Sequence, residues 1–118
     1  MEQLNRIELR GYVGAAKKTK AGDSEFLRFT IVTGYAYRTS DGSPVIENTW
    51  MDCLYFLRKD SGKVLPDLTK GDRVHLTGRL KHQRYTDSEG GYHDTYAVLV
   101  KELERYSDET ALNPEWDS

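Results

Sequence analysis

The sequence predicts a single all-β domain: a small five-stranded barrel with one short helix between the third and fourth strands. Apolar and polar residues alternate over five short segments, the pattern of strands with one buried face. Only residues 57–70 offer room for a helix, and Gly62 and Pro66 interrupt it. The 118 residues, 37% of them hydrophobic, suffice for one modest core and favour a small barrel or sandwich over a thick layered fold.

The first two strands are expected at residues 5–16 and 25–33. Gly11 and Gly14 in the first predict a bend or a bulge, as a tightly coiled barrel strand requires. Residues 17–24 between the strands are polar and basic, which predicts a turn that either is solvated or contacts phosphate. The side chains expected to point inward are Ile7, Leu9, Val13, Leu27, Phe29 and Ile31.

The third strand, residues 47–56, is the segment around which the rest is organised. Its alternation places Trp50, Asp52, Leu54 and Phe56 on one face and Met51, Cys53 and Tyr55 on the other. Since the second set can face the core, the first must meet another layer, a subunit or a ligand. The preceding residues 34–46 carry turn residues and predict a long hairpin loop, a type of segment that is often functional.

The fourth and fifth strands are expected at residues 73–85 and 92–103. In the insert before them, Val64, Leu65 and Leu68 form an apolar patch that could plug one end of the barrel. The fifth strand is apolar on both sides at residues 97–100, which fits an interior strand or a subunit contact. The fourth has an apolar face of Val74, Leu76, Gly78 and Leu80 and an opposite face of Arg73, Arg79, Lys81 and Tyr85.

Charge divides the chain into a basic body and an acidic end. Residues 1–101 hold 16 bases and 13 acids, a net charge of +3, whereas residues 102–118 hold one base and six acids, a net charge of −5. Such asymmetry is typical of a nucleic-acid-binding body with an interaction tail. We therefore expect a domain at residues 1–105 and a short, acidic, flexible tail at residues 106–118.

Several classes of function lack their signals. The chain has no apolar signal region and no run of about 20 apolar residues, so we expect a cytoplasmic protein with no membrane partner. The single cysteine, Cys53, is expected to be a buried free thiol, and the three histidines lack the spacing of metal ligands. With no phosphate-binding glycine loop or catalytic cluster either, we expect no enzyme, no metal and no cofactor.

Five short strands with a helix after the third follow the order of the OB-fold, a Greek-key barrel whose second and third strands and adjoining loops bind oligonucleotides. Binding of single strands without sequence preference needs aromatic faces for stacking and cations for the backbone. Both kinds of side chain occur at the outward or loop positions predicted above. The candidate nucleic-acid-binding residues are Tyr37, Arg38, Trp50, Phe56, Arg79, Lys81, Arg84 and Tyr85.

Five stretches of the sequence, taken in order and spacing, match a known pattern. They are IELRGYVG at residues 7–14, RFTIVT at 28–33, NTWMDCLYF at 48–56, LTKGDRVHLTGRL at 68–80 and RYTD at 84–87. In these stretches the chain resembles the bacterial single-stranded-DNA-binding proteins (SSB). The resemblance implies that Tyr37, Trp50, Phe56 and Tyr85 occupy base-stacking positions. It further implies a homo-oligomer, with a tetramer favoured over a dimer, that protects single-stranded DNA during replication, recombination and repair.

Three features depart from that family pattern. Met51 stands where histidine is frequent in the family, and Asp52 stands where a basic residue is common. In addition, Pro66 breaks the helix. The linker is nearly absent, and the acidic tip carries a tryptophan in place of the usual phenylalanine. Members of the family recruit replication and repair proteins through this tip, so Glu115, Trp116 and Asp117 are the candidate partner-binding residues.

Three other functions stay open on the sequence. The chain could be an OB-fold protein-interaction module, such as a primosomal subunit, with Trp50 and Phe56 buried in a subunit contact. RNA could be the ligand, because stacking does not detect the 2′-hydroxyl. A nuclease or phosphatase is the catalytic alternative, although the motifs such an enzyme would need are not visible in the sequence.

Overall fold

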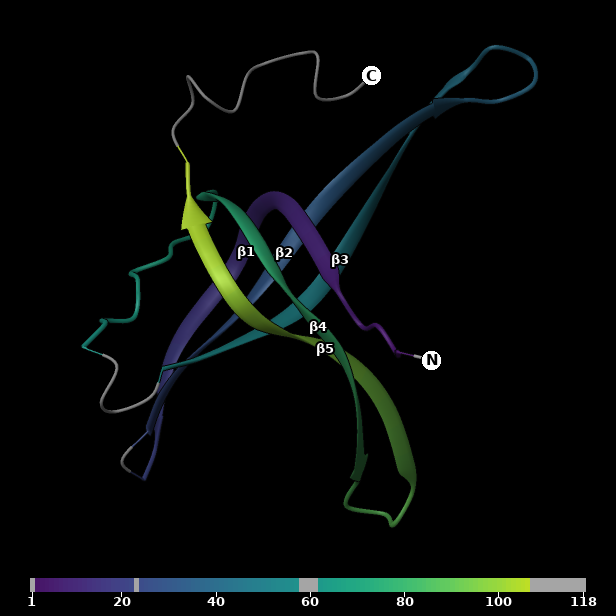
Figure 1. The fold of residues 1–118 in the computed structure, drawn as a ribbon. Coiled ribbons are helices and arrows are strands. Elements are labelled where there is room, and N and C mark those ends of the chain that lie inside the picture. The colour runs from purple at the N-terminus through teal and green to yellow at the C-terminus, as the bar shows by residue number, and fades with distance from the viewer. Residues whose placement is uncertain (1, 23, 58–61, 107–118) are drawn as a thin grey trace.

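A computed structural model of the protein describes residues 2–22, 24–57 and 62–106. It contains five strands in the predicted order, which confirms the all-β class (Figure 1). The strands are β1 (Ile7–Ala21), β2 (Ser24–Arg38), β3 (Pro44–Leu57), β4 (Arg73–Thr86) and β5 (Tyr92–Arg105). No helix among the described residues is long and apolar enough to cross a membrane.

The strands form one closed barrel in the order β1, β2, β3, β5, β4. β1 closes it by pairing with β2 along one edge and with β4 along the other. β3 and β5 run parallel over only three residue pairs, from Asp52 with Ala97 to Leu54 with Leu99. β5 thus lies between β3 and β4, which confirms it as an interior strand.

The core follows the predicted alternation. On β2 the inward residues Leu27, Phe29 and Ile31 are almost completely buried, whereas Arg28 between them is exposed. Burial of this apolar surface is the main force that holds the barrel closed. The buried cluster comprises Val13, Leu27, Phe29, Ile31, Cys53, Leu65, Leu68, Val74, Leu76 and Val98.

The connection from β3 to β4 plugs one end of the barrel with two leucines. Leu65 and Leu68 are buried in the core cluster, as predicted, but Val64 is 86% exposed and does not belong to the plug. The predicted short helix is not shown: residues 62–72 contain none, and residues 58–61 lie outside the described part of the chain. Pro66 has no N–H group to donate to a helical hydrogen bond, which favours an extended connection here.

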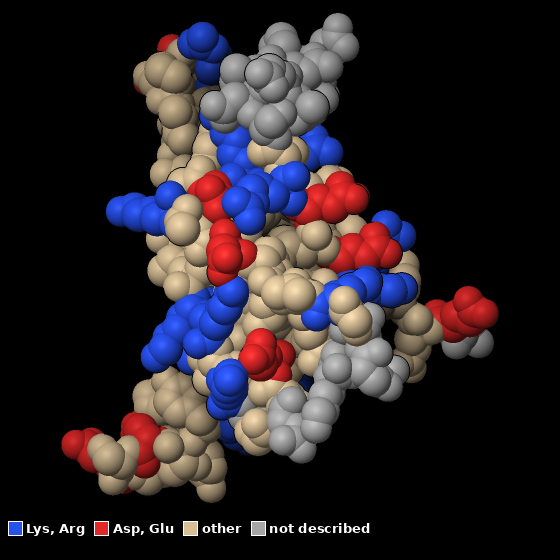
Figure 2. Space-filling model, turned by 90° about the vertical axis from the view of Figure 1, so that its left-hand side faces the viewer, with Lys and Arg blue, Asp and Glu red and all other residues tan. Residues whose placement is uncertain are grey.

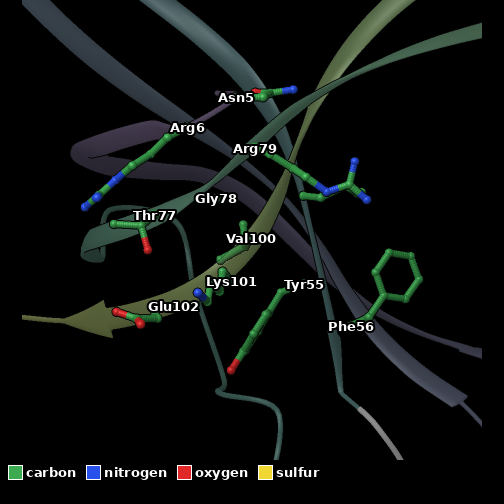
Figure 3. Close-up of a pocket in the computed structure, with 11 residues that line it drawn as sticks. Asn5, Arg6, Tyr55, Phe56, Thr77, Gly78, Arg79, Val100, Lys101 and Glu102 are labelled. Atoms are coloured by element: carbon green, nitrogen blue, oxygen red, sulfur yellow. The ribbon is translucent and has the colours of Figure 1, made fainter. Parts of the chain in front are cut away.

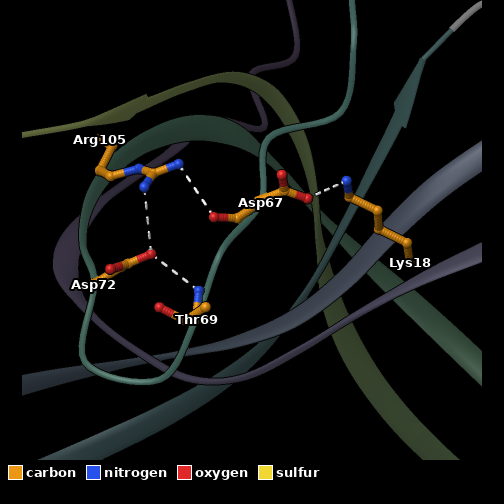
Figure 4. Close-up of polar contacts among 5 residues, drawn as sticks. All are labelled: Lys18, Asp67, Thr69, Asp72 and Arg105. Carbon is orange, nitrogen blue, oxygen red and sulfur yellow. Dashed lines mark hydrogen bonds and ion pairs between the residues drawn. The ribbon is translucent and has the colours of Figure 1, made fainter.

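Polar contacts fix this connection to the strands on either side of it (Figure 4). The side chain of Lys18 on β1 pairs with Asp67. At the end of β5, Arg105 donates to the Asp67 carbonyl at 3.1 Å and lies 3.7 Å from Asp72. Asp72 in turn accepts the backbone N–H of Thr69 at 2.9 Å. The plug is therefore held by charged contacts in addition to its two buried leucines.

The prediction of a long loop at residues 34–46 is wrong. β2 and β3 continue to pair without interruption up to Arg38 and Pro44, and only residues 39–43 form the turn. The two strands project from the barrel as a ribbon at the upper right of Figure 1. This arm has no buried face, so its residues lack the apolar alternation that identifies a strand in a sequence.

The other hairpins also extend beyond the core. β1 continues to Ala21 and pairs with Ser24, so most of the turn predicted at residues 17–24 is strand. The second arm consists of β4 and β5, which pair as far as Thr86 with Tyr92 and project downward in Figure 1. Leu80, predicted to face the core, is 37% exposed because β4 leaves the barrel there.

Candidate nucleic-acid interface

The outer face of β3 carries two exposed aromatic rings. Trp50 is 61% and Phe56 52% exposed, whereas Cys53, on the opposite face, is completely buried. Leu54 shares the outer face but is only 8% exposed, so it forms the floor between the two rings. The predicted division of this strand into a core face and an outer face is confirmed.

Trp50 is placed by a bulge in the neighbouring sheet. The register of β1 against β2 shifts between Val13 and Ala15, which leaves Gly14 as the extra residue. A Cβ atom on Gly14 would lie 2.7 Å from Thr30 Oγ1 and closer still to Cζ3 of Trp50. The indole of Trp50 therefore reaches from β3 across β2 and occupies space that a side chain at Gly14 would fill.

Phe56 is placed by a second aromatic ring. Phe26 lies directly opposite it on β2, with ring centroids 5.1 Å apart and planes inclined by 33°. Such tilted pairs stabilise cross-strand contacts and restrict both rings. Phe26 was absent from the predicted site, although its alternation with Arg28 and Thr30 on the outward face was visible in the sequence.

Phe56 and Arg79 line one groove of about 690 Å³. Figure 3 shows the two side chains directed to the same side of the barrel, Phe56 from β3 and Arg79 from β4. Leu99 of β5 lies between these strands and also lines the groove. We call this the Phe56 groove. It brings one predicted stacking residue and one predicted cation together.

A second groove, of about 670 Å³, lies next along the same face. Lys81 and Tyr85 of β4 line it, together with Arg28 of β2 and Asp52 of β3. We call it the Lys81 groove. Because Arg79 and Lys81 are two residues apart on β4, the two grooves follow one another along the sheet. Arg28 was expected to face outward but was not included in the predicted site.

Tyr85 is held in a stack at the end of the Lys81 groove. Its ring lies 5.1 Å from that of His93 on β5, with the planes inclined by 20°. His93 is hydrogen-bonded in turn to Asp87 at 2.5 Å. This bond to His93, with help from the backbone N–H groups of Gly91 and Glu89, lowers the pKa of Asp87. Tyr85 is 53% exposed and keeps an accessible face.

Arg84 has close partners on its own arm. Its Nε donates to Asp94 at 3.0 Å, and its guanidinium lies 5.8 Å from the centroid of Tyr92. Asp94 also contacts His82 at 3.0 Å. Side chains alternate along β4, so Arg84 and His82 point to the face opposite Lys81 and Tyr85, although both border the Lys81 groove.

Tyr37 and Arg38 lie on the β2–β3 arm, away from both grooves. The Tyr37 hydroxyl donates to Glu47 at 3.0 Å, and the alternation places its ring on the face opposite Trp50. Arg38 shares the outward face of Trp50, and its Nη1 donates to the carbonyl of Gly42 in the turn at 2.8 Å. The structure therefore separates these two candidates from Phe56, Arg79 and Lys81.

The side of the barrel bearing the β3–β4 connection shows no large area of one charge. In Figure 2 basic and acidic side chains alternate over it. On the outer face, by contrast, the grooves and the adjoining recess are lined by the cations Lys17, Arg28, Arg79 and Lys81. Among the described residues, the acids in these linings are Asp52 and Glu102. Cations on this face could follow a phosphate backbone.

The described residues show no group of three or more side chains that could hold a metal ion. Burial raises the pKa of the Cys53 thiol to about 12, with a smaller contribution from the charge of Asp52. That thiol is therefore protonated at neutral pH. The candidate tail residues Glu115, Trp116 and Asp117 lie outside the described residues.

A closed five-stranded barrel of this strand order, with aromatic rings and cations along one outer face, defines an OB-fold with the features of an oligonucleotide-binding surface. Residues 4–106 match the model of the Single-strand binding protein family. The chain belongs to this family. No curated protein sequence matches it significantly.

The solved structures that are similar in fold include three single-stranded-DNA-binding proteins. A Plasmodium falciparum SSB in complex with ssDNA has a TM-score of 0.78 at 18% identity, over 91% of this chain and 98% of that one. A deletion mutant of the single-stranded DNA binding protein from Thermus aquaticus has a TM-score of 0.71 at 16% identity, over 89% and 51%. A small single-stranded DNA-binding protein from Streptomyces coelicolor has a TM-score of 0.63 at 15% identity, over 90% and 96%. At identities this low, the TM-scores show the shared barrel fold alone.

Proposed function

We propose that this protein binds single-stranded DNA with little sequence preference. The observation that carries the proposal is the outer face of β3, where Trp50 and Phe56 expose their rings and Phe56 shares a groove with Arg79 of β4. Membership of the single-strand binding family supports the same ligand. Bases would stack on the aromatic rings, each stack contributing about 1 to 3 kcal/mol, because every base has a π face.

The two grooves offer aromatic rings for the bases and cations for the phosphates. Phe56 and Tyr85 offer rings in the Phe56 and Lys81 grooves, and Arg79 and Lys81 offer charges between them. Phosphates neutralised by these cations release counterions, so binding should weaken with salt. Duplex DNA should bind poorly, because its bases are already stacked on one another and cannot reach the rings.

In the cell, the protein would coat and protect single strands during replication, recombination and repair as a non-enzymatic homo-oligomer, with a tetramer favoured. Acidic residues of the tail around Trp116 would recruit replication or repair proteins. The arms formed by β2–β3 and β4–β5 extend the surface along which a strand could run (Figure 1).

The direct test is titration with oligo-dT, followed by anisotropy of the labelled oligonucleotide and by tryptophan fluorescence. We expect binding with quenching of fluorescence, and affinity for a duplex of equal length at least tenfold lower. Trp50→Ala should weaken binding by about 1 to 3 kcal/mol without lowering Tm, since the ring is exposed. Tyr96→Ala, an exposed aromatic on the other face of the β4–β5 arm, is the matched control.

Two outcomes would argue against the proposal. Unchanged fluorescence with no anisotropy change would favour the protein-interaction module, in which Trp50 meets another chain. Loss of the oligonucleotide during incubation with magnesium would indicate a nuclease. Equal affinity for oligo-dT and oligo-U would extend the ligand to RNA.

A further inference from the structure

A carboxylate stands on the proposed DNA-binding face where a cation would be expected. Asp52 is exposed on the outer face of β3, two residues from Trp50 and two from Leu54. It borders the Lys81 groove and also a smaller recess of about 190 Å³, whose lining includes Lys17 and Thr30. A strand that passes from Trp50 to the Lys81 groove would therefore pass over Asp52.

The carboxylate of Asp52 is not engaged by the residues that surround it in the fold. Thr30 lies directly opposite it on β2 and Ala97 beside it on β5, and neither is charged. Within residues 2–22, 24–57 and 62–106, its carboxylate makes no hydrogen bond or ion pair. Arg28 and Lys81 line the same groove without pairing with it. Both oxygens are therefore available to a ligand.

A carboxylate at this place can accept hydrogen bonds but cannot donate them. It repels phosphate, so the backbone of a bound strand would follow Arg28, Lys17 and Lys81 instead. What it can accept is the exocyclic amino group of cytosine, adenine or guanine. Thymine carries no amino group, and its one ring donor, N3–H, lies between two carbonyl oxygens that the carboxylate would repel.

The spacing on β3 suits this contact. Side chains two residues apart on one face of a strand are separated by about 7 Å. The Trp50 indole reaches across β2 to Gly14 of β1, and Asp52 borders the recess lined by the next residue of β1, Ala15. The edge of a base stacked on the indole would therefore meet the Asp52 carboxylate. Single-stranded bases expose their pairing edges, which leaves the amino group free to donate.

We propose that Asp52 is a base-discriminating residue, which favours bases that carry an exocyclic amino group over thymine at the position beside Trp50. This inference rests on the proposed binding of single-stranded DNA. It adds a chemical preference to a site in which stacking alone would accept every base.

The test compares oligo-dC with oligo-dT of equal length in the wild type and in Asp52→Asn. An asparagine amide both donates and accepts, so it can pair with either base. We expect the ratio of Kd for oligo-dT to Kd for oligo-dC to fall by roughly threefold to tenfold in the variant. Affinity for oligo-dT should rise, because the repulsion of phosphate and of thymine carbonyls is removed.

Glu104→Gln is the matched control, since it removes one exposed negative charge from β5, at the register position of His75. It should leave the ratio of the two Kd values unchanged. If Asp52→Asn raises both affinities by the same factor, the residue only repels phosphate and the inference is wrong. If the wild type binds neither oligonucleotide, the proposed function itself fails.

Discussion

The indole of Trp50 lies where a side chain at position 14 would otherwise be. A Cβ on Gly14 would overlap Cζ3 of Trp50 and come within 3.2 Å of its Cε3. Gly14 is the extra residue of the β1 bulge, and the next residue, Ala15, donates its N–H to Thr30 Oγ1 at 3.1 Å. The bulge and the missing side chain together make room for a ring that belongs to another strand.

Gly14→Ala should therefore displace the Trp50 ring and weaken binding of single strands by about 1 to 3 kcal/mol, the value of one lost stack. Anisotropy titration with labelled oligo-dT measures this loss. Gly34→Ala is the control, because its added methyl group meets only Asn48 Oδ1, at an ordinary 3.5 Å. Equal affinities in the two variants would show that Gly14 does not position Trp50.

The two plug leucines should contribute to stability rather than to binding. Leu65→Ala removes a buried side chain and should lower the free energy of unfolding by about 2 to 5 kcal/mol, because it leaves a cavity at the barrel end. Val64→Ala, one residue away but exposed, should change it by less than about 0.5 kcal/mol. Urea unfolding of both variants checks this. Similar losses in the two would mean that the connection does not plug the barrel.

Strand positions could be predicted from the sequence where one face of the strand is buried, but not where both faces are exposed to solvent. The alternation of Leu27, Phe29 and Ile31 identified β2, but the same strand continues to Arg38 with no inward apolar residue to mark it. Residues such as Gly34 and Ser40 then favoured a loop. Both arms are held together by pairing between two strands. The residue types along one strand do not show which residues of another strand it pairs with.

The candidate site was predictable residue by residue but not as an arrangement. Alternation alone placed Trp50 and Phe56 outward, which exposure confirms. It could not give the register of β4 against β5, which sets Arg84 opposite Asp94. Nor could it show that Phe26 faces Phe56. Such partners depend on which strands meet, so they became visible only in the folded barrel.

The β4–β5 arm should lose stability in acid. Hydrogen bonds from Arg84 and then His82 lower the pKa of Asp94 from its ordinary value of 3.8. A carboxyl group whose pKa is lower in the folded state stabilises the fold above its unfolded pKa, and that stabilisation is lost as pH falls through the folded pKa. Asp94→Asn should therefore lower Tm at about pH 7 and have no effect at about pH 2.

Thermal unfolding of wild type and Asp94→Asn at both pH values measures this. Arg84→Gln breaks the same pair from its other side and should show the same pH dependence, which makes it an internal check. A difference in Tm that persists unchanged in acid would mean that Asp94 acts through packing and not through its charge.

The acidic end of the chain should compete with DNA for the basic face. Residues 107–118 contain four acids and no base, and they follow directly on residues 1–106, which hold 17 bases and 15 acids, a net charge of +2. A tethered polyanion has a high local concentration near the grooves lined by Arg28, Arg79 and Lys81. Removing residues 107–118 should therefore raise affinity for oligo-dT, most strongly at low salt, where charges are least screened.

A variant with the four acids replaced by their amides keeps the length of the tail and Trp116, and its affinity for oligo-dT should rise by as much. Titration across a salt series separates the cases: if truncation leaves affinity at low salt unchanged, the tail does not compete, and if only truncation raises it, contacts other than charge are responsible.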